Sequence, residues 1–412
     1  MKKIWILFTV LAYALSLSAL AAEPTPSDDL DAELDAADVD ADVFLEDAVP
    51  VTALTEELAA PSAILMERTG GTVLWEKNAD ERLEPASVTK VMTMLLIAEA
   101  IDGGTLSLED AVSASAYAAS MGGSQVYLKE HETFTVREML KCIAVASAND
   151  AAVAMAEHIA GSEGTFVERM NRRAQELGMM NTHFSNCTGL PCEGEHLTTA
   201  RDIAIMSAEL MRHEWIREYT TIWMDSIRDG SFTLSNTNKL IYYYDGATGL
   251  KTGFTQSAGY CLSAAAERDG AEYIAVVLHC ATSAERFESA KTLLSYAFAN
   301  YVPFTPAPAS PLPPVPVRLG ETDWVQPVFP CAPALVLPRE TIPGLELSTE
   351  LTPEVTAPVE AGDALGTLRL VSDGEVLGEY PIVAGARVER ISVLRLWKRL
   401  LGAFFGSPFK QT

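Results

Sequence analysis

Three things are scarce in this sequence: cysteine, basic residues and long apolar runs. Its 412 residues include six cysteines, which is too few for a disulfide scaffold at this length. Lysine and arginine total 30 against 56 aspartates and glutamates, for a net charge of −26. Because phosphate recognition needs a basic face, this balance argues against a nucleic-acid-binding protein. Only residues 4–20 form an apolar run that approaches the thickness of a bilayer.

The apolar run at the N-terminus has the order of a secretory signal. Lys2 and Lys3 precede it and an Ala-x-Ala site ends it, so we expect a signal peptide over residues 1–22, cleaved after Ala21 or Ala22. An uncleaved membrane anchor is the alternative, because this run can almost span a bilayer. The sequence therefore predicts an exported protein that works outside the cytoplasm.

Two segments have the composition of linkers. Residues 23–57 carry thirteen Asp or Glu and no Lys or Arg, mixed with Ala and Pro, which predicts an extended acidic linker. Residues 303–316 contain seven prolines, which predicts a stiff spacer. These linkers bound a large unit at 58–302 and a small, β-rich unit at 317–385, where short strand-like runs alternate with Gly and Pro turns.

The predicted elements of the large unit are those of an α+β domain. A hairpin turns at residues 69–71. A strongly apolar helix begins near Ala86, and because it is apolar on nearly all sides we expect it to be central and buried. Further helices are expected over 165–178, 199–213 and 283–298, and strands over 249–255, 259–266 and 273–280. Because strands come from both ends with helices between them, we expect one sheet assembled from both ends and flanked by helices.

Two consecutive helices are recognised by their caps. Thr135 and Glu138 form a capping box that begins a helix ending near Ser147. Asp150 is placed to cap the helix that follows. The segment around Asn149 is therefore expected to be a break between two helices.

The C-terminal residues 386–412 predict an amphipathic helix. Ile391, Leu394, Trp397 and Leu401 recur at helical spacing, and the last 26 residues carry six Lys or Arg against one Glu. Such a helix fits the surface of an anionic membrane, which we expect it to contact through residues 388–406. Docking of this helix on the β-rich unit of the chain is the alternative.

One group of cysteines and histidines has a spacing of interest. His183, Cys187, Cys192 and His196 form the pattern H-x3-C-x4-C-x3-H, which could seat zinc. A local disulfide between the cysteines, or two free thiols in a loop, are the alternatives. Because the spacing matches none of the usual finger patterns, we expect no metal here.

Three short motifs follow one another along the large unit. Ser87-Val-Thr-Lys90 begins the apolar helix, Ser147-Ala-Asn149 lies between two helices, and a Lys-Thr-Gly motif starts at Lys251 on a strand. Each motif alone occurs by chance in many chains. Together, and in this order, they are the motif set of penicillin-binding proteins and class A β-lactamases.

The first motif has the residue types of nucleophilic catalysis. A serine hydroxyl is a poor nucleophile until a base holds its proton. Ser87 and Lys90 are three residues apart on one helix, so both side chains project from the same face. A desolvated lysine can be neutral and accept the proton. Pro85 suits a helix start, where backbone N–H groups point at a developing oxyanion.

The other two motifs contain the residue types needed to bind a peptide substrate and to transfer its protons. Ser147 can relay a proton towards the leaving amine, and Asn149 can orient the lysine base and the substrate amide. Lys251 adds positive potential and Thr252 offers a hydroxyl to a substrate carboxylate. Gly253 removes the side chain where the substrate must approach the strand edge.

The chain resembles the low-molecular-weight penicillin-binding proteins, the serine-type D-alanyl-D-alanine carboxypeptidases, over roughly residues 58–385 and the tail. The resemblance rests on PASVTK, SAND, NTNKL at 236–240 and DGATGLKTGFTQSAGYCL at 245–262. It implies a transpeptidase-like α+β domain followed by a small all-β domain and a membrane-surface helix. It also implies a location at the outer face of the cytoplasmic membrane or in the cell wall.

The resemblance further implies a two-step acyl transfer without metal or cofactor. Ser87 would attack a peptidoglycan stem peptide ending in D-Ala–D-Ala, release the last D-Ala and pass the acyl group to water, and β-lactams would inhibit it covalently. By matching position, the backbone N–H groups of Ser87 and Phe254 would form the oxyanion hole. Arg286 would help to hold the substrate carboxylate, to which arginine can bind in bidentate fashion.

The sequence departs from the family pattern at two places, and other activities remain as alternatives. Phe254 stands where some members carry histidine, and the cysteine pair in residues 187–194 is not a family feature that we recognise. A class A β-lactamase would need a glutamate in an E-x-x-L-N context, and residues 162–198 contain no such string. A D,D-endopeptidase would use the same residues, and a non-catalytic peptidoglycan-binding protein is the alternative from another class.

Overall fold

The chain was analysed as a computed structural model that describes residues 54, 58–330, 332 and 334–405. It divides into two compact units at residues 299 and 300. The expected signal peptide, all of the acidic linker except Leu54, and Cys331 lie outside the described residues. Within the described part of the chain, no helix is long and apolar enough to cross a membrane.

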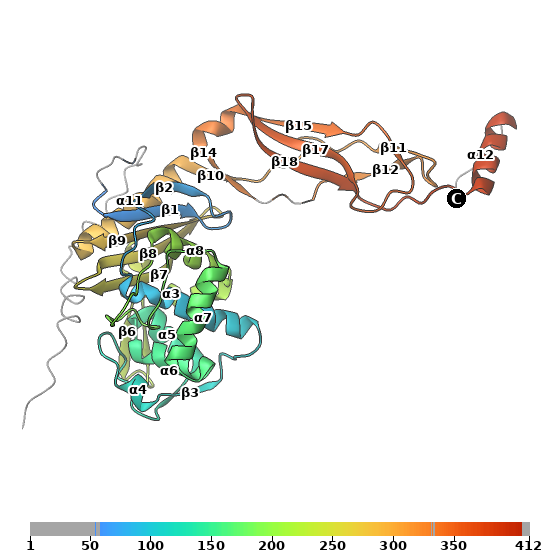
Figure 1. The fold of residues 1–412 in the computed structure, drawn as a ribbon. Helices are drawn as coiled ribbons and strands as arrows, with labels where there is room; N and C mark the ends of the chain where they lie inside the picture. The colour runs from blue at the N-terminus through green and yellow to red at the C-terminus, as the bar shows by residue number, and fades with distance from the viewer. Residues whose placement is uncertain (1–53, 55–57, 331, 333, 406–412) are drawn as a thin grey trace, which may run out of the picture. The chain divides into compact units, whose positions relative to one another are not determined.

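The first unit is built on one antiparallel sheet in the order β2-β1-β9-β8-β7 (Figure 1). Its strands are β1 (Ser62–Glu67), β2 (Val73–Lys77), β7 (Ala247–Thr255), β8 (Gly259–Arg268) and β9 (Ala271–Cys280). β1 pairs with β9, with Ser62 opposite Leu278, so the two ends of the domain share one sheet. The expected hairpin and the assembly of the sheet from both ends are confirmed.

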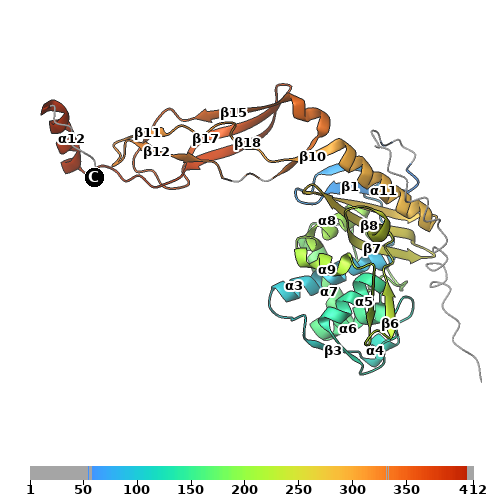
Figure 2. The ribbon, with the colours of Figure 1, turned by 180° about the vertical axis from the view of Figure 1, so that it is seen from behind.

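Helices cover both faces of this sheet. In the views from front and back, α11 (Ser283–Asn300) lies over one face, and the other helices lie on the opposite side (Figures 1 and 2). These are α3 (Lys90–Asp102), α4 (Ala116–Ala119), α5 (Val136–Ala146), α6 (Asn149–Ala160), α7 (Glu163–Glu176), α8 (Ala200–Leu210), α9 (Arg217–Thr220) and α10 (Leu240–Tyr243). Two small hairpins complete the unit: β3 (Ala111–Ser113) with β4 (Thr133–Thr135), and β5 (Met224–Ile227) with β6 (Phe232–Ser235).

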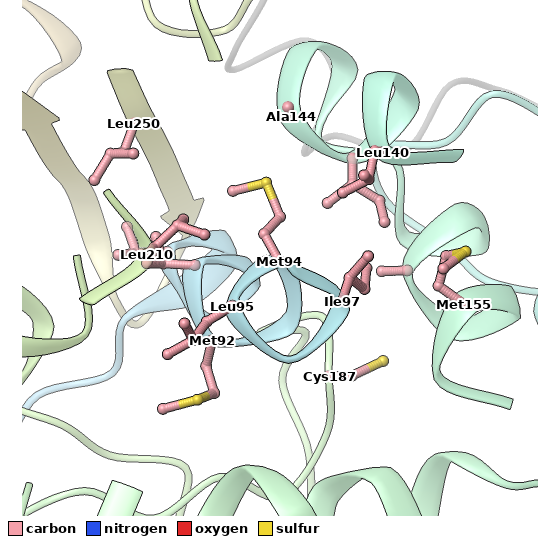
Figure 3. Packing of buried hydrophobic residues seen from close by; sticks show 14 of the residues in the cluster. Met92, Met94, Leu95, Ile97, Leu140, Ala144, Met155, Cys187, Leu210 and Leu250 are labelled. Atoms are coloured by element: carbon pink, nitrogen blue, oxygen red, sulfur yellow. The ribbon is translucent and has the colours of Figure 1, made fainter. Parts of the chain in front are cut away.

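Helix α3 is the centre of the hydrophobic core. The short 3-10 turn η3 (Ala86–Thr89) leads into it. Figure 3 shows its side chains among Leu210 and Leu250 on one side and Leu140 and Met155 on the other. Leu95 at its middle is completely buried. The expectation of a helix buried on nearly all sides is confirmed, and it explains why the helix has no polar face.

The capping box predicted for α5 is present, but the cap predicted for α6 is wrong. The Thr135 hydroxyl accepts from the Glu138 N–H at 3.2 Å, and the Glu138 carboxylate accepts from the Thr135 N–H at 2.9 Å. Asp150 lies inside α6, whose N-cap is Ala148. Its carboxylate instead accepts from the Leu128 N–H at 2.9 Å, because a buried carboxylate is best stabilised by the free N–H groups of that neighbouring segment.

The second unit is a small all-β domain. Its largest sheet has the order β13-β18-β17-β15, a second has the order β12-β11-β16, and β10 pairs with β14. The strands are β10 (Tyr301–Phe304), β11 (Val315–Arg318), β12 (Trp324–Val325), β13 (Pro327–Val328), β14 (Leu335–Pro338), β15 (Leu345–Leu351), β16 (Val355–Thr356), β17 (Ala364–Ser372) and β18 (Glu375–Ala384). The 3-10 turn η5 (Arg339–Gly344) follows β14, and α12 (Val393–Phe405) ends the described chain. The predicted fold class, an α+β domain followed by an all-β domain, is confirmed.

Candidate active site

Ser87 and Lys90 meet at the start of α3. Ser87 is half-buried on η3, and Lys90 is the first residue of α3 and completely buried. The Lys90 Nζ lies 2.9 Å from the Ser87 Oγ, and it donates to the Thr188 carbonyl at 2.9 Å. A hydroxyl and an amine therefore share a hydrogen bond in a desolvated position, as nucleophilic catalysis requires.

The second motif lies at the junction of α5 and α6. Ser147 is the C-cap of α5, adopts the left-handed conformation with φ 60° and ψ 25°, and is 1% exposed. Asn149 begins α6, and its Nδ2 donates to the Gly122 carbonyl at 2.8 Å. Its Oδ1 is buried and has no hydrogen-bond partner among the described residues. One acceptor of this motif is therefore left unused among the described residues.

The third motif lies on the edge strand β7, directly against the first motif. A Cβ atom on Gly253 would lie 2.7 Å from the Pro85 carbonyl oxygen and 3.0 Å from the Ser87 nitrogen. Glycine is thus the only residue that lets β7 run this close to the nucleophile. Lys251 is buried, and its Nζ donates to the Thr252 carbonyl at 3.0 Å.

Thr237 connects the second and third motifs, and the sequence reasoning did not single it out. Its N–H donates to the Val145 carbonyl near the end of α5 at 3.2 Å. Its hydroxyl accepts from the Thr252 hydroxyl at 2.6 Å. Its position within NTNKL was the available signal, but that string indicated the family and not this bridging role.

Phe254 and Arg286 both contact the Tyr260 ring next to Gly253. The Phe254 ring stacks on Tyr260 at 4.3 Å between ring centroids. Arg286 is 2% exposed, and its guanidinium donates to the Gly253 carbonyl at 3.3 Å and to the Ser283 hydroxyl at 3.1 Å. The structure therefore places the Arg286 guanidinium against the backbone of β7, with Tyr260 within cation–π distance.

The loop that follows α7 does not form the four-residue group considered for zinc. Cys187 and Cys192 are free thiols, the first buried and the second exposed. The His196 Nδ1 accepts from the Ser185 N–H at 3.1 Å, and its Nε2 lies 2.8 Å from the Thr89 hydroxyl. Burial lowers the pKa of His196 to about 4, so the ring is neutral at pH 7. Across the described ranges, no three His, Cys, Asp or Glu side chains converge in a metal-binding arrangement.

One pocket on the described part of the first unit reaches Ala86, the residue before the nucleophile, and another lies away from it. The first, of about 300 Å³, is lined by Glu84, Ala86, Gly189, Leu190, Pro191, Cys192, Gly194, Glu195, His196 and Leu197. A larger pocket of about 470 Å³ near the C-terminal end of α3 contains none of the motif residues. We therefore identify the site by the chemistry at Ser87 and not by cavity size.

Two protein-family models match this chain. The D-alanyl-D-alanine carboxypeptidase family model matches residues 49–282, and the model of the C-terminal domain of penicillin-binding protein 5 matches residues 311–390. The chain is 44% identical over 356 residues to the D-alanyl-D-alanine carboxypeptidase DacF of Bacillus subtilis, covering 84% of this chain and 91% of that protein.

Solved structures show the same likeness. Penicillin-binding protein 5 from Haemophilus influenzae superposes on this chain with a TM-score of 0.71 at 27% identity. The match covers 82% of this chain and 100% of that one. Penicillin-binding protein D2 from Listeria monocytogenes in its ampicillin-bound form has a TM-score of 0.55 at 32% identity, covering 60% of this chain and 100% of that one. This chain therefore belongs to the D-alanyl-D-alanine carboxypeptidases of the penicillin-binding protein family.

Proposed function

We propose that this serine peptidase removes the terminal D-Ala from peptidoglycan stem peptides ending in D-Ala–D-Ala, with Ser87 as the nucleophile. The observation that carries the proposal is the 2.9 Å contact between the Lys90 Nζ and the Ser87 Oγ at the buried start of α3. Neutral Lys90 takes the hydroxyl proton while the Ser87 oxygen attacks the carbonyl of the penultimate D-Ala.

The oxyanion and the substrate are held by the other motifs. The backbone N–H groups of Ser87 and Phe254 donate to the developing oxyanion, since Gly253 lets β7 lie against the nucleophile. Asn149, whose buried Oδ1 has no partner among the described residues, orients the lysine base and the substrate amide. Ser147 relays the proton towards the amine of the departing D-Ala.

The substrate carboxylate is bound at the β7 end of the site. Lys251 supplies positive charge, and the Thr252 hydroxyl, which donates to Thr237 in the structure, turns its proton to the carboxylate when substrate binds. Arg286 helps through its charge and by fixing the Gly253 carbonyl, to which it donates at 3.3 Å. After D-Ala leaves, water attacks the acyl-Ser87 ester and Lys90 accepts a proton from that water. Lys90 then returns this proton to the Ser87 Oγ as the C–O bond to the acyl group breaks, which releases the shortened peptide acid and restores the free hydroxyl.

The direct test is the intact mass of the mature protein after incubation with benzylpenicillin, with Ser87→Ala as the control. A one-to-one adduct that is lost in Ser87→Ala supports the acyl-serine mechanism, in line with the ampicillin-bound relative. Consumed penicillin without an adduct would indicate a β-lactamase, and untouched penicillin a non-catalytic binder. Product analysis on a cross-linked dimer of stem peptides then separates carboxypeptidase from endopeptidase activity.

The same proposal includes an exported layout with a membrane-surface tail. The catalytic domain covers residues 58–302, the spacer 303–316, the β-rich domain 317–385 and the tail 386–412. On α12, the apolar side chains of Val393, Leu394, Trp397, Leu400 and Leu401 are 48–73% exposed. An exposed apolar stripe beside basic residues fits an anionic membrane at the outer face of the cytoplasmic membrane.

Two ion pairs favour the alternative in which α12 docks on its own domain. Arg395 and Arg399 pair with Glu321 and Asp323, at 2.5 and 2.7 Å. These pairs are exposed and therefore weak, and they leave the apolar side chains uncovered. Truncation after Ala384 should abolish binding of the mature protein to anionic vesicles, and vesicle binding that survives truncation would reject the membrane role.

A further inference from the structure

One peptide group of the loop after α7 is held between the lysine base and an asparagine. The carbonyl of this peptide, that of Thr188, accepts from the Lys90 Nζ at 2.9 Å. The N–H of the same peptide, that of Gly189, donates to the Asn186 Oδ1 at 2.7 Å. A chain of hydrogen bonds thus runs from Ser87 through Lys90 and this peptide to Asn186.

Asn186 uses its amide to close the loop on itself. Its Oδ1 also accepts from the N–H and the hydroxyl of Thr188, both at 3.1 Å. Its Nδ2 donates to the Leu190 carbonyl at 2.8 Å. The side chain therefore contacts residues on both sides of the 188–189 peptide and leaves its plane little freedom to rotate.

Two further contacts hold the loop against the nucleophile. The Thr93 hydroxyl of α3 donates to the Cys187 carbonyl at 2.6 Å. A Cβ atom on Gly189, whose φ is 84°, would lie 1.8 Å from the Ala86 carbonyl oxygen. The loop is thus in direct backbone contact with the residue before Ser87, which only glycine permits.

The direction of the Thr188 carbonyl matters because of the geometry of an amine. A neutral lysine has two N–H bonds and one lone pair, and only the lone pair can accept the serine proton. When the carbonyl takes one N–H, rotation about the Cε–Nζ bond is restricted and the lone pair can be directed at the Ser87 Oγ. Orientation of this kind is a large part of the advantage of an enzyme.

We propose that Asn186 is a positioning residue for acylation: it sets the plane of the 188–189 peptide, which directs the lone pair of Lys90 at Ser87. The inference rests on the proposed function, because it assumes that Lys90 is the base. Misplacement by about 1 Å can cost about 100-fold in rate. We therefore expect replacement of Asn186 to slow acylation by about 10- to 100-fold without weakening the initial binding of the β-lactam.

The chain offers a matched control. Asn171 holds the start of the same loop with the same chemistry, since its Nδ2 donates to the Phe184 carbonyl and its Oδ1 accepts from the Phe184 N–H, both at 2.8 Å. Among the described residues, the Asn171 side chain makes no hydrogen bond to the 188–189 peptide. Asn171→Leu therefore removes a loop anchor without touching the orientation of Lys90.

The test is stopped-flow acylation of the full mature chain by a fluorescent penicillin, resolved into the dissociation constant of the first complex and the acylation rate constant. Asn186→Leu should lower the rate constant by about 10- to 100-fold with little change in the dissociation constant. Asn186→Asp keeps an acceptor for the Gly189 N–H, so it should recover most of the rate when each variant is measured at its own pH optimum. Asn171→Leu should lower the melting temperature and leave the rate constant near that of the wild type.

Several results would overturn this role. They are an unchanged rate constant in Asn186→Leu, an equal loss in Asn171→Leu, or an Asn186→Asp protein as slow as Asn186→Leu. If Asn186→Leu does not fold, Asn186→Gln takes its place, because the extra methylene displaces the amide. An acylation rate constant of Asn186→Gln equal to that of Asn186→Asp would then reject the proposal. A wild-type chain that forms no Ser87 adduct would instead reject the proposed function, so the two failures are distinguishable.

Discussion

Gly253 gives the sharpest prediction because its surroundings are backbone atoms. A methyl group there would lie 2.7 Å from the Pro85 carbonyl oxygen and 3.0 Å from the Ser87 nitrogen. Normal carbon contacts lie at about 3.5–4.0 Å, so β7 and the Ser87 segment must separate by several tenths of an ångström. No side-chain rotation can relieve the contact. The Gly253→Ala substitution therefore acts on the distance between the two N–H groups assigned to the oxyanion hole.

The size of the effect follows from the value of one oxyanion donor. Removal of such a donor costs about 10²- to 10³-fold in rate, and a partial displacement should cost less. We expect Gly253→Ala to acylate about 10- to 100-fold more slowly with a fluorescent penicillin. The control is Gly164→Ala on α7, where no atom lies within 4 Å of the new methyl group. That change should leave acylation unaffected and favour the helix by about 0.5–1 kcal/mol.

A Gly253→Ala enzyme that acylates as fast as the wild type would refute this reasoning, provided that its melting temperature shows a folded protein. It would mean that β7 moves without cost, or that the Phe254 N–H does not contact the oxyanion. Slowing by Gly164→Ala to the same extent would also contradict it. Neither result would bear on Ser87 itself, since the mass adduct tests that residue separately.

Three further predictions concern the base, the core and pH. Lys90→Ala should slow acylation by about 10²- to 10⁴-fold, the range for a lost general base, and a near-normal acylation rate would move the base elsewhere. Leu95→Ala should lower the free energy of unfolding by about 2–5 kcal/mol in a urea titration, because Leu95 is 0% exposed. The control is Met180→Ala, which should change the free energy of unfolding by less than about 0.5 kcal/mol because Met180 is 78% exposed. Burial lowers the pKa of His196 to about 4, against an ordinary value of about 6.5 in the unfolded chain, so the unfolded chain binds its proton first as pH falls. The free energy of unfolding should therefore fall by up to about 3 kcal/mol as the pH is lowered from about 6.5 to about 4. A His196→Gln protein with the same fall over that pH range would exclude His196 as its cause.

Prediction from the sequence succeeded where the determinants are local. The capping box of Thr135 and Glu138 joins residues three apart, and the turn at residues 69–71 joins β1 directly to β2, so both could be predicted from neighbouring residues. The pattern of Asp150 was local as well, but its carboxylate found a better partner in the Leu128 N–H, which lies 22 residues away. A side chain that could cap a helix can also bond to groups far away in the sequence, and the sequence shows only the partners that are close along the chain.

The sequence by itself determined the family, the fold class and the identities of the candidate catalytic groups, because the types and order of Ser87, Lys90, Asn149 and Lys251 specify the chemistry. Only the tertiary structure decided what holds these groups in place. The partner of Lys90, the Thr188 carbonyl, lies 98 residues along the chain, and backbone carbonyls are the same in every residue. No sequence pattern can indicate which carbonyl is near a given amine. That choice is made when the loop packs against α3, and packing depends on the shape of the whole core.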